Sequence, residues 1–201
     1  MNSFSRCCRR YTCLADRFSD SQSAWPACRG ELLALRWQDI NFEKATLQVA
    51  QVIELVGWKM SLKEPKTERS RRSIALSTRV VQELRHHRKT QAEECLRLGC
   101  SRFELVFPQW DGTIRNPNNF SKQFADEAAA AKLPHITFHG LRHTHITHLL
   151  RSGVPVHVVS ARAGHSNPTV TLNVYSHLLQ GDQEKAAAVM DEALRTVIKD
   201  R

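Results

Sequence analysis

The chain has 201 residues, a formal net charge of +9 and a pI of about 9.6. Its composition, 41% hydrophobic and 24% charged, allows one good-sized domain with a real core. No apolar run is long enough to span a bilayer, so we expect a soluble, cytoplasmic protein with no membrane partner. The positive charge favours a polyanionic partner, although basic ribosomal and membrane-surface proteins share this balance.

The first 28 residues differ in composition from the rest of the chain. They are rich in Ser, Arg and Cys, contain few aliphatic residues and show neither a helical nor a strand period. A mitochondrial presequence is also rich in Arg and Ser, but Asp16, Asp20 and the cysteines fit that class poorly. We therefore expect residues 1–28 to be disordered.

The cysteines do not form a recognisable framework. Their spacing matches neither paired zinc knuckles nor a small secreted disulfide scaffold. We expect free thiols in a reducing cytosol. The six are Cys7, Cys8, Cys13, Cys28, Cys95 and Cys100.

From residue 30 onward the pattern becomes regular. Leucines and a tryptophan at helical spacing predict a short amphipathic helix that ends in a turn near Asp39. An alternating, β-branched run predicts a strand over 46–56, and residues 58–63 are expected to return as its hairpin partner. Residues 72–76 predict a third short strand. Together these strands indicate a small antiparallel sheet near the start of the domain.

The remaining elements are predicted to be helices. Ser77 or Thr78 is expected to cap a helix that runs to about Leu98, with the basic cluster at 85–89 mostly outward. Further helices are expected over 117–131, as three helices across 139–175, and over 183–198. The fold class is therefore α+β and mostly helical.

Residues 139–175 carry a set of groups suited to a phosphodiester. His139 and Arg142 are three residues apart, so on a helix both side chains leave the same face. Arginine binds phosphate oxygens in bidentate geometry, and a tyrosine such as Tyr175 can form a covalent intermediate. His165 lies at a predicted helix end, where an imidazole can donate a hydrogen bond to an anion. Each residue alone has an ordinary structural explanation, but their order and spacing together predict a phosphate site.

The histidines of this stretch also suggest a metal site. His139 and His143 are four apart, as in zinc-binding helices, but the zincin pattern requires Glu directly after the first His, and Gly140 stands there. His145 and His148 lie on another face and have no carboxylate nearby in the sequence. We expect no metal and no other cofactor.

Three segments resemble the tyrosine recombinases, the phage-integrase family. Residues 134–179 (PHITFHGLRHTHITHLLRSGVPVHVVSARAGHSNPTVTLNVYSHLL) resemble the carboxy-terminal catalytic signature of that family. Residues 29–42 (RGELLALRWQDINF) resemble its first helix, and residues 64–76 (EPKTERSRRSIAL) its second-to-third strand turn. The resemblance implies a tyrosine-recombinase catalytic domain over residues 29–198, with a three-stranded antiparallel sheet and without the family's amino-terminal core-binding domain.

The resemblance also implies roles for individual residues. Tyr175 would attack a DNA phosphate and leave a 3′-phosphotyrosyl link with a free 5′-hydroxyl. Arg142 would clamp the nonbridging oxygens, His165 would donate a hydrogen bond to one of them, and His139 would assist proton handling. Lys66 would protonate the leaving 5′-oxygen. Double-stranded DNA would be the partner, bound by a tetramer in a bacterial cytoplasm.

One residue departs from the family pattern. The first helix of the family carries an arginine three residues before its Glu, and Glu31 places Cys28 at that position. Arg29 is one residue further on, and one helical step of about 100° directs its side chain elsewhere. Loss of such an arginine would cost on the order of a thousandfold in rate.

The codons for residues 25–28 offer an explanation for Cys28. Trp-Pro-Ala-Cys is encoded TGG-CCN-GCN-TGY, and reading one nucleotide later permits Gly-Leu-Arg, the sequence that the family has here. We hypothesise that residues 1–28 are an out-of-frame extension joined to the recombinase frame at Arg29. The nucleotide sequence decides this.

Three functions remain open from the sequence. The first is a site-specific DNA strand transferase, and the second is a catalytically impaired remnant that binds DNA or a partner recombinase. The third is a helical transcription regulator with a basic face and no covalent chemistry. The final helix at 183–198 either docks on a neighbouring protomer or packs on its own domain.

Overall fold

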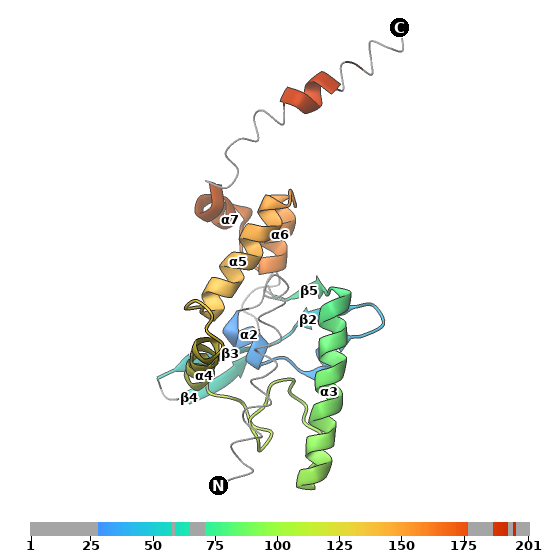
Figure 1. Cartoon of the computed structure of the whole chain (residues 1–201), viewed down its shortest axis with the longest axis vertical. Helices are drawn as coiled ribbons and strands as arrows, with labels where there is room; N and C mark the ends of the chain where they lie inside the picture. Colours follow the sequence, from blue (N-terminus) through green and yellow to red (C-terminus); the bar gives the residue numbers. More distant parts are fainter. Residues whose placement is uncertain (1–27, 58, 65–70, 177–186, 193–194, 196–201) are drawn as a thin grey trace.

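The structure is a computed structural model that describes residues 28–57, 59–64, 71–176, 187–192 and 195 (Figure 1). Of residues 1–28, which were expected to be disordered, only Cys28 is described, and residues 1–27 lie outside the described residues. The loop that carries Lys66 also lies outside them. Residues 187–192 are helical, and most of the rest of the final helix expected over 183–198 also lies outside them.

The first described helix, α2, is shorter than the sequence predicts. It spans Arg29–Leu33, and the 3₁₀ helix η1 follows at Trp37–Asp39. Between them the chain turns toward residues 104–106: the Trp37 N–H donates to the Glu104 carbonyl at 3.0 Å, and the Val106 N–H donates to the Leu35 carbonyl at 2.8 Å. These long-range bonds take backbone groups that a longer helix would use internally.

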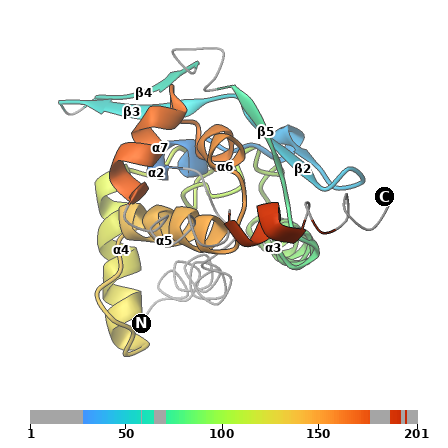
Figure 2. The same cartoon turned by 90° about the horizontal axis from the view of Figure 1, so that it is seen from above.

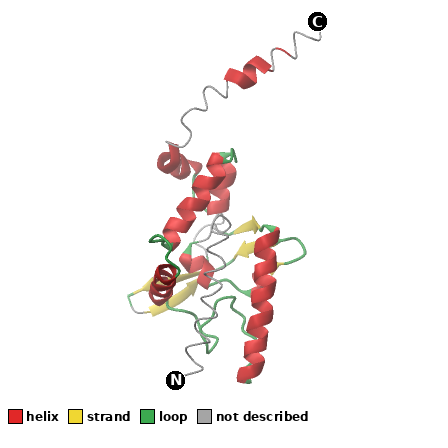
Figure 3. Ribbon diagram, viewed as in Figure 1, coloured by secondary structure: helices red, strands yellow, loops and turns green. Residues whose placement is uncertain are grey.

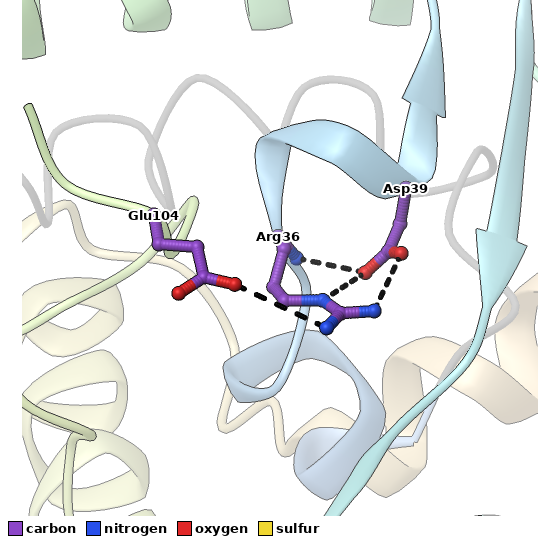
Figure 4. Close-up of polar contacts among 3 residues, drawn as sticks. All are labelled: Arg36, Asp39 and Glu104. Atoms are coloured by element: carbon purple, nitrogen blue, oxygen red, sulfur yellow. Dashed lines mark hydrogen bonds and ion pairs between the residues drawn. The ribbon is translucent and has the colours of Figure 1, made fainter.

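A polar cluster holds the turn into η1. The Arg36 guanidinium donates to both carboxylate oxygens of Asp39 at 2.9 Å, and its other edge lies 3.9 Å from Glu104 (Figure 4). The Arg36 N–H also donates to Asp39 at 3.3 Å, which satisfies a backbone group at the start of η1 (Figure 4).

The strands form two small sheets. β1 (Ile40–Asn41), β2 (Thr46–Val49) and β5 (Arg72–Ala75) make an antiparallel sheet in the order β1-β2-β5. β3 (Val52–Val56) pairs with β4 (Lys59–Lys63) as a separate antiparallel hairpin. A small three-stranded antiparallel sheet is therefore present, but it contains β1 in place of the predicted hairpin partner. That partner is confirmed over residues 59–63, as part of a separate two-stranded sheet.

The prediction of one continuous strand over residues 46–56 is wrong. The chain leaves one sheet after Val49 and enters the other at Val52, and Ala50 and Gln51 belong to neither strand. Leu47, Val49 and Ile53 are all buried, so the apolar alternation continues across a change of pairing partner. An alternating pattern reports which face is buried, not which strand lies alongside.

Helix α3 follows the prediction closely. It spans Thr78–Leu98, the Ser77 side chain caps it, and Gly99 ends it with φ at +65°. The basic cluster at 85–89 is exposed except for His87, whose Nε2 lies 2.7 Å from the Val106 carbonyl. Burial lowers the pKa of His87 to about 4, so this imidazole is a neutral core group that links α3 to the following segment.

The remaining described helices also agree with the sequence. They are α4 (Pro117–Ala130), α5 (Phe138–Arg151), α6 (Val156–Ala163) and α7 (Pro168–Tyr175). In both views α3 and α4 stand on opposite sides of the molecule, and α5, α6 and α7 group together beyond the sheets (Figures 1 and 2). Helices predominate over strands, as expected for this fold class (Figure 3).

The buried hydrophobic residues form two clusters. The larger one gathers α2, the sheets, α3 and α4, and the smaller one gathers α5, α6 and α7. Helix α5 connects them because Phe138, at its start, packs on Phe120 and Phe124 of α4 with ring centroids 5.0 and 4.5 Å away. The smaller cluster consists of Ile146, Leu150, Val159, Ala163 and Tyr175.

Two further expectations concern the described part of the chain. Cys28, Cys95 and Cys100 are free thiols, as predicted for these three. Within the described ranges, no helix combines the length and the apolar character that crossing a membrane requires.

Candidate active site

Tyr175 is held at the edge of the smaller hydrophobic cluster. It is the last residue of α7, and only 4% of its surface is exposed. Asn167 caps the start of this short helix by accepting from the Thr169 N–H. The phenol group does not point into the hydrocarbon, because its hydroxyl makes a short hydrogen bond with Nδ1 of His143 on α5. Desolvation raises the pKa of Tyr175, and the positive charge of Arg142 opposes that rise.

Two histidines of α5 form a chain of hydrogen bonds that starts at the Tyr175 hydroxyl. Nε2 of His143 lies 2.7 Å from Nε2 of His139, one turn earlier on the same helix. The rings meet edge to face, with centroids 4.3 Å apart. His139 is exposed and His143 is half-buried, so the chain leads from a buried phenol to the surface.

Arg142 lies at the centre of the charged groups. Burial lowers the pKa of Arg142, the carboxylate of Glu31 opposes that shift, and the positive charge of Arg72 adds to it; Cys28 and Tyr175 also lie within reach of the Arg142 charge. These interactions place Arg142 among residues of α2 and α7 as well as its own helix. A half-buried guanidinium in this position is suited to bind two oxygens of a singly charged phosphodiester.

His165 is positioned by the end of α6. Gly164 ends that helix with φ at +76°, a conformation that favours glycine, and the chain turns so that Nδ1 of His165 lies 2.7 Å from Oγ1 of the buried Thr171. This bond leaves Nε2 for a ligand. Burial is the largest cause that lowers the pKa of His165. The charge of Arg142 lowers it further, followed by those of Arg72 and His143, so these groups lie around the ring.

A buried ion pair connects these elements, and the sequence reasoning did not identify it. Arg72 of β5 donates to the two carboxylate oxygens of Glu31 at 2.8 and 3.0 Å, and its Nε donates to the Arg162 carbonyl at 2.9 Å. Its guanidinium also lies against Gly164, where an added Cβ would come within 2.5 Å. Glu31 served only to set the register of the first helix, and Arg72 was expected only as part of a strand.

The two residues at the start of α2 lie as their spacing predicts. Cys28 is the N-cap residue, its N–H donates to Glu31 at 2.8 Å, and its thiol is near enough to Arg142 for their charges to interact. Arg29 instead donates to Oγ of Ser121 on α4 at 2.8 Å. Arg29 therefore points away from the cluster around Arg142, as the helical step predicts.

The other histidines of α5 are not part of this group. His145 is buried and accepts from Nε of Arg162 at 3.1 Å, whereas His148 is exposed. Across the described ranges, no three His, Cys, Asp or Glu side chains gather where they would hold a metal ion. The sequence suggests His143 only as a possible metal ligand together with His139. Its contact with Tyr175 could not be predicted, because the only sequence signal is its position directly after Arg142.

The structure thus brings four of the five predicted residues into one region. Tyr175 and His139 are connected through His143, and the charges of Arg142 reach both Tyr175 and His165. Lys66 lies outside the described residues.

A cavity of about 580 Å³ lies elsewhere, along α3. Arg88 stacks over Trp37 and Phe42 there, with its guanidinium carbon 5.7 Å from each ring centroid. None of the candidate residues lines it. The candidate site lies apart from this cavity and extends from the buried Tyr175 to the exposed His139.

Comparison with known proteins places the chain in a family. Residues 29–181 match the phage integrase family. A tyrosine recombinase XerC-like protein of Caldanaerobacter subterraneus is 32% identical over 178 residues, which cover 82% of this chain and 46% of that protein. The ICEBs1 integrase of Bacillus subtilis is 27% identical over 167 residues, with coverage of 82% and 45%. The chain spans about half the length of these relatives.

Solved structures agree with this assignment. The Tn1549 transposon integrase, in complex with transposon right-end DNA, superposes with a TM-score of 0.63 at 25% identity and covers 81% of this chain and 53% of that one. The XerA recombinase has the same fold, with a TM-score of 0.57 at 19% identity over 84% of this chain and 55% of its own. By its sequence match and its fold, the chain belongs to the phage integrase family of tyrosine recombinases.

Proposed function

We propose that this chain supplies the catalytic domain of a site-specific recombinase that cuts and rejoins DNA through a 3′-phosphotyrosyl intermediate. The observation that carries the proposal is the hydroxyl of Tyr175, held against His143 and beside Arg142 on one surface. The relatives are named as recombinases and integrases, and the Tn1549 integrase structure contains transposon-end DNA, which supports double-stranded DNA as the substrate.

The reaction would begin with attack of Tyr175 Oη on a backbone phosphorus. A phenol has an ordinary pKa of about 10, and here desolvation raises the pKa of Tyr175 further. The attack therefore requires a base for the phenolic proton, and His139 would accept that proton in concert with its neighbours. As the Oη–P bond forms, the bond from phosphorus to the 5′-oxygen breaks.

Positive groups would stabilise the transition state. Negative charge gathers on the equatorial oxygens of the phosphorane, where preorganised donors are most effective. Arg142 would bind two of these oxygens, and Nε2 of His165 would donate to one of them. We assign protonation of the leaving 5′-oxygen to Lys66 on the basis of the family pattern. The reverse sequence, with a 5′-hydroxyl as the attacking group, would rejoin the strand.

Cys28 would limit the rate of this reaction. A thiol cannot hold phosphate oxygens as a guanidinium does, and Arg29 is directed to Ser121 instead. We expect cleavage on the order of a thousandfold slower than with an arginine at position 28. Assembly of four copies on DNA, a catalytic domain over 29–198 and a bacterial cytoplasmic location belong to the same proposal.

A covalent trapping experiment tests the proposal. The substrate is a nicked duplex built from the chromosomal junctions that flank the encoding gene, so that the short cleaved strand diffuses away and the adduct accumulates. A protein–DNA adduct that survives a denaturing gel and disappears in Tyr175→Phe supports a strand transferase. Retention of DNA without an adduct supports an impaired DNA-binding remnant. Loss of both DNA retention and adduct formation overturns the proposal.

A further inference from the structure

His143 occupies the position between the phenol and the surface. Its Nδ1 is bonded to the Tyr175 hydroxyl, and its Nε2 lies 2.7 Å from Nε2 of His139. His143 is therefore in direct contact with the atom that would attack phosphorus.

The hydrogen bonds can be oriented so that each group donates to the next, from Tyr175 through His143 to His139, which suits removal of the phenolic proton. If the phenol donates to Nδ1 of His143, the proton of the neutral imidazole resides on Nε2. Nε2–H then donates to Nε2 of His139, whose own proton resides on Nδ1. In this arrangement every nitrogen along the path has a partner, and a proton can move from Oη toward the exposed ring of His139.

The surroundings keep His143 neutral and able to accept a proton. Burial lowers its pKa from the ordinary value of about 6.5, and the nearby charges of His139 and Arg142 lower it further. Among the described residues, the titratable groups that face it are these two residues of α5, Tyr175 of α7, and His165 after α6. The lowered pKa favours the unprotonated ring, whose Nδ1 can accept a hydrogen bond from the phenol.

We infer that His143 is a catalytic residue: it takes the phenolic proton of Tyr175 during attack and passes its Nε2 proton to His139. This inference rests on the proposed function, because it assigns a role within that reaction. The family pattern assigned proton handling to His139 alone. In this chain His139 reaches the phenol only through His143.

The protons and bonds balance in both directions. In cleavage, Oη–H breaks and Oη–P forms, while Nδ1 of His143 gains the proton and Nε2 releases one to His139. The phosphorus–5′-oxygen bond breaks, and the general acid protonates that oxygen. In rejoining, the 5′-hydroxyl gives its proton to the deprotonated general acid as its oxygen bonds phosphorus, the Oη–P bond breaks, and the same histidine path returns a proton to Tyr175.

The test separates activation of the nucleophile from protonation of the leaving group. The substrate is the nicked duplex with a 5′-bridging phosphorothiolate at the scissile position, because a thiolate leaves without a general acid. Two variants are compared with the unchanged chain: His143→Phe, which keeps an aromatic ring, and His143→Asn, which keeps an acceptor near the Nδ1 position but cannot take up a proton. His148→Phe, at an exposed histidine of the same helix, is the matched control.

Both His143 variants are expected to cut the phosphorothiolate substrate about a hundredfold more slowly at pH 7, within the usual range for loss of a general base. The variant rates should rise about tenfold per pH unit toward pH 9, as tyrosinate forms without a base. The unchanged chain and His148→Phe should show a plateau instead. Equal rates for His143→Asn and the unchanged chain would overturn the proton role, because a hydrogen bond alone would then suffice.

A second measurement does not depend on activity. Long-range nitrogen–proton NMR correlations report the tautomer of His143 in the free protein. The unchanged chain is expected to show the Nε2–H tautomer of His143, and Tyr175→Phe should alter it. An Nδ1–H tautomer in the unchanged chain would contradict the inference. Absence of an adduct in the unchanged chain and in Cys28→Arg would instead overturn the proposed function, whatever the tautomer. The two failures are therefore distinguishable.

Discussion

Replacing Arg72 tests whether the ion pair with Glu31 holds the site together. The two side chains are only 8% and 13% exposed, and they share hydrogen bonds of 2.8 and 3.0 Å. Arg72→Leu removes these bonds and the bond to the Arg162 carbonyl, and it leaves a buried carboxylate without its cation. We expect a loss of about 3–5 kcal/mol in the free energy of unfolding, typical for breaking a buried pair at one end.

The neighbouring residue supplies a matched control. Arg71 pairs with Glu64, but the two side chains are 52% and 75% exposed. Arg71→Leu should therefore cost no more than about 1 kcal/mol. A double variant, Glu31→Leu with Arg72→Met, removes both charges and should recover part of the loss, because no uncompensated charge remains buried.

Urea unfolding followed by tryptophan fluorescence measures all four proteins. The midpoint should fall far more for Arg72→Leu than for Arg71→Leu, with the double variant between Arg72→Leu and the unchanged chain. Equal losses for the two single variants would refute the reasoning, since the buried pair would then contribute no more than an exposed one.

Four further predictions follow from the region around α2. Burial raises the pKa of Glu31, but the hydrogen bonds and charge of Arg72 more than offset this, so the pKa is lowered overall. The stability that the ionised carboxylate contributes is therefore present above about pH 4.5 and should be lost as the pH falls further. Thermal melts should show this loss in the unchanged chain and not in Glu31→Gln. Cys28→Arg should raise adduct formation on the trapping substrate about a thousandfold. Arg29→Ala should leave the rate of adduct formation unchanged at saturating protein, because this side chain binds Ser121. Gly30→Ala should lower the urea midpoint by the equivalent of about 1–3 kcal/mol, since its Cβ would lie 2.6 Å from a backbone carbonyl oxygen of β3.

Local patterns predicted the helices well. The cap at Ser77 and the glycine after Leu98 mark the ends of α3, and both signals depend only on neighbours in the sequence. The strands were harder to predict, because Ala50 and Gln51 interrupt pairing without interrupting the apolar alternation. The end of α2 could not be predicted either, because it depends on backbone hydrogen bonds of Leu35 and Trp37 with residues far along the chain.

The candidate site shows the same division. His139, Arg142, His165 and Tyr175 could be named because their order along the chain resembles a family pattern. The partners that hold them could not, because Thr171, Glu31, Arg72 and His143 meet them only after folding. Hydrogen bonds between elements leave no period in the sequence, whereas burial does.

The two hydrophobic clusters have a consequence for local opening of the protein. Phe138 and the hydrogen bonds of Arg72 and Arg162 join them, so α5, α6 and α7 can exchange their amide protons as a unit separate from the larger core. Arg142 and Tyr175 belong to that unit, whereas Cys28 and Glu31 belong to the other. Opening of that unit would therefore separate Arg142 and Tyr175 from Cys28 and Glu31, and amide exchange in α7 would measure how often this happens.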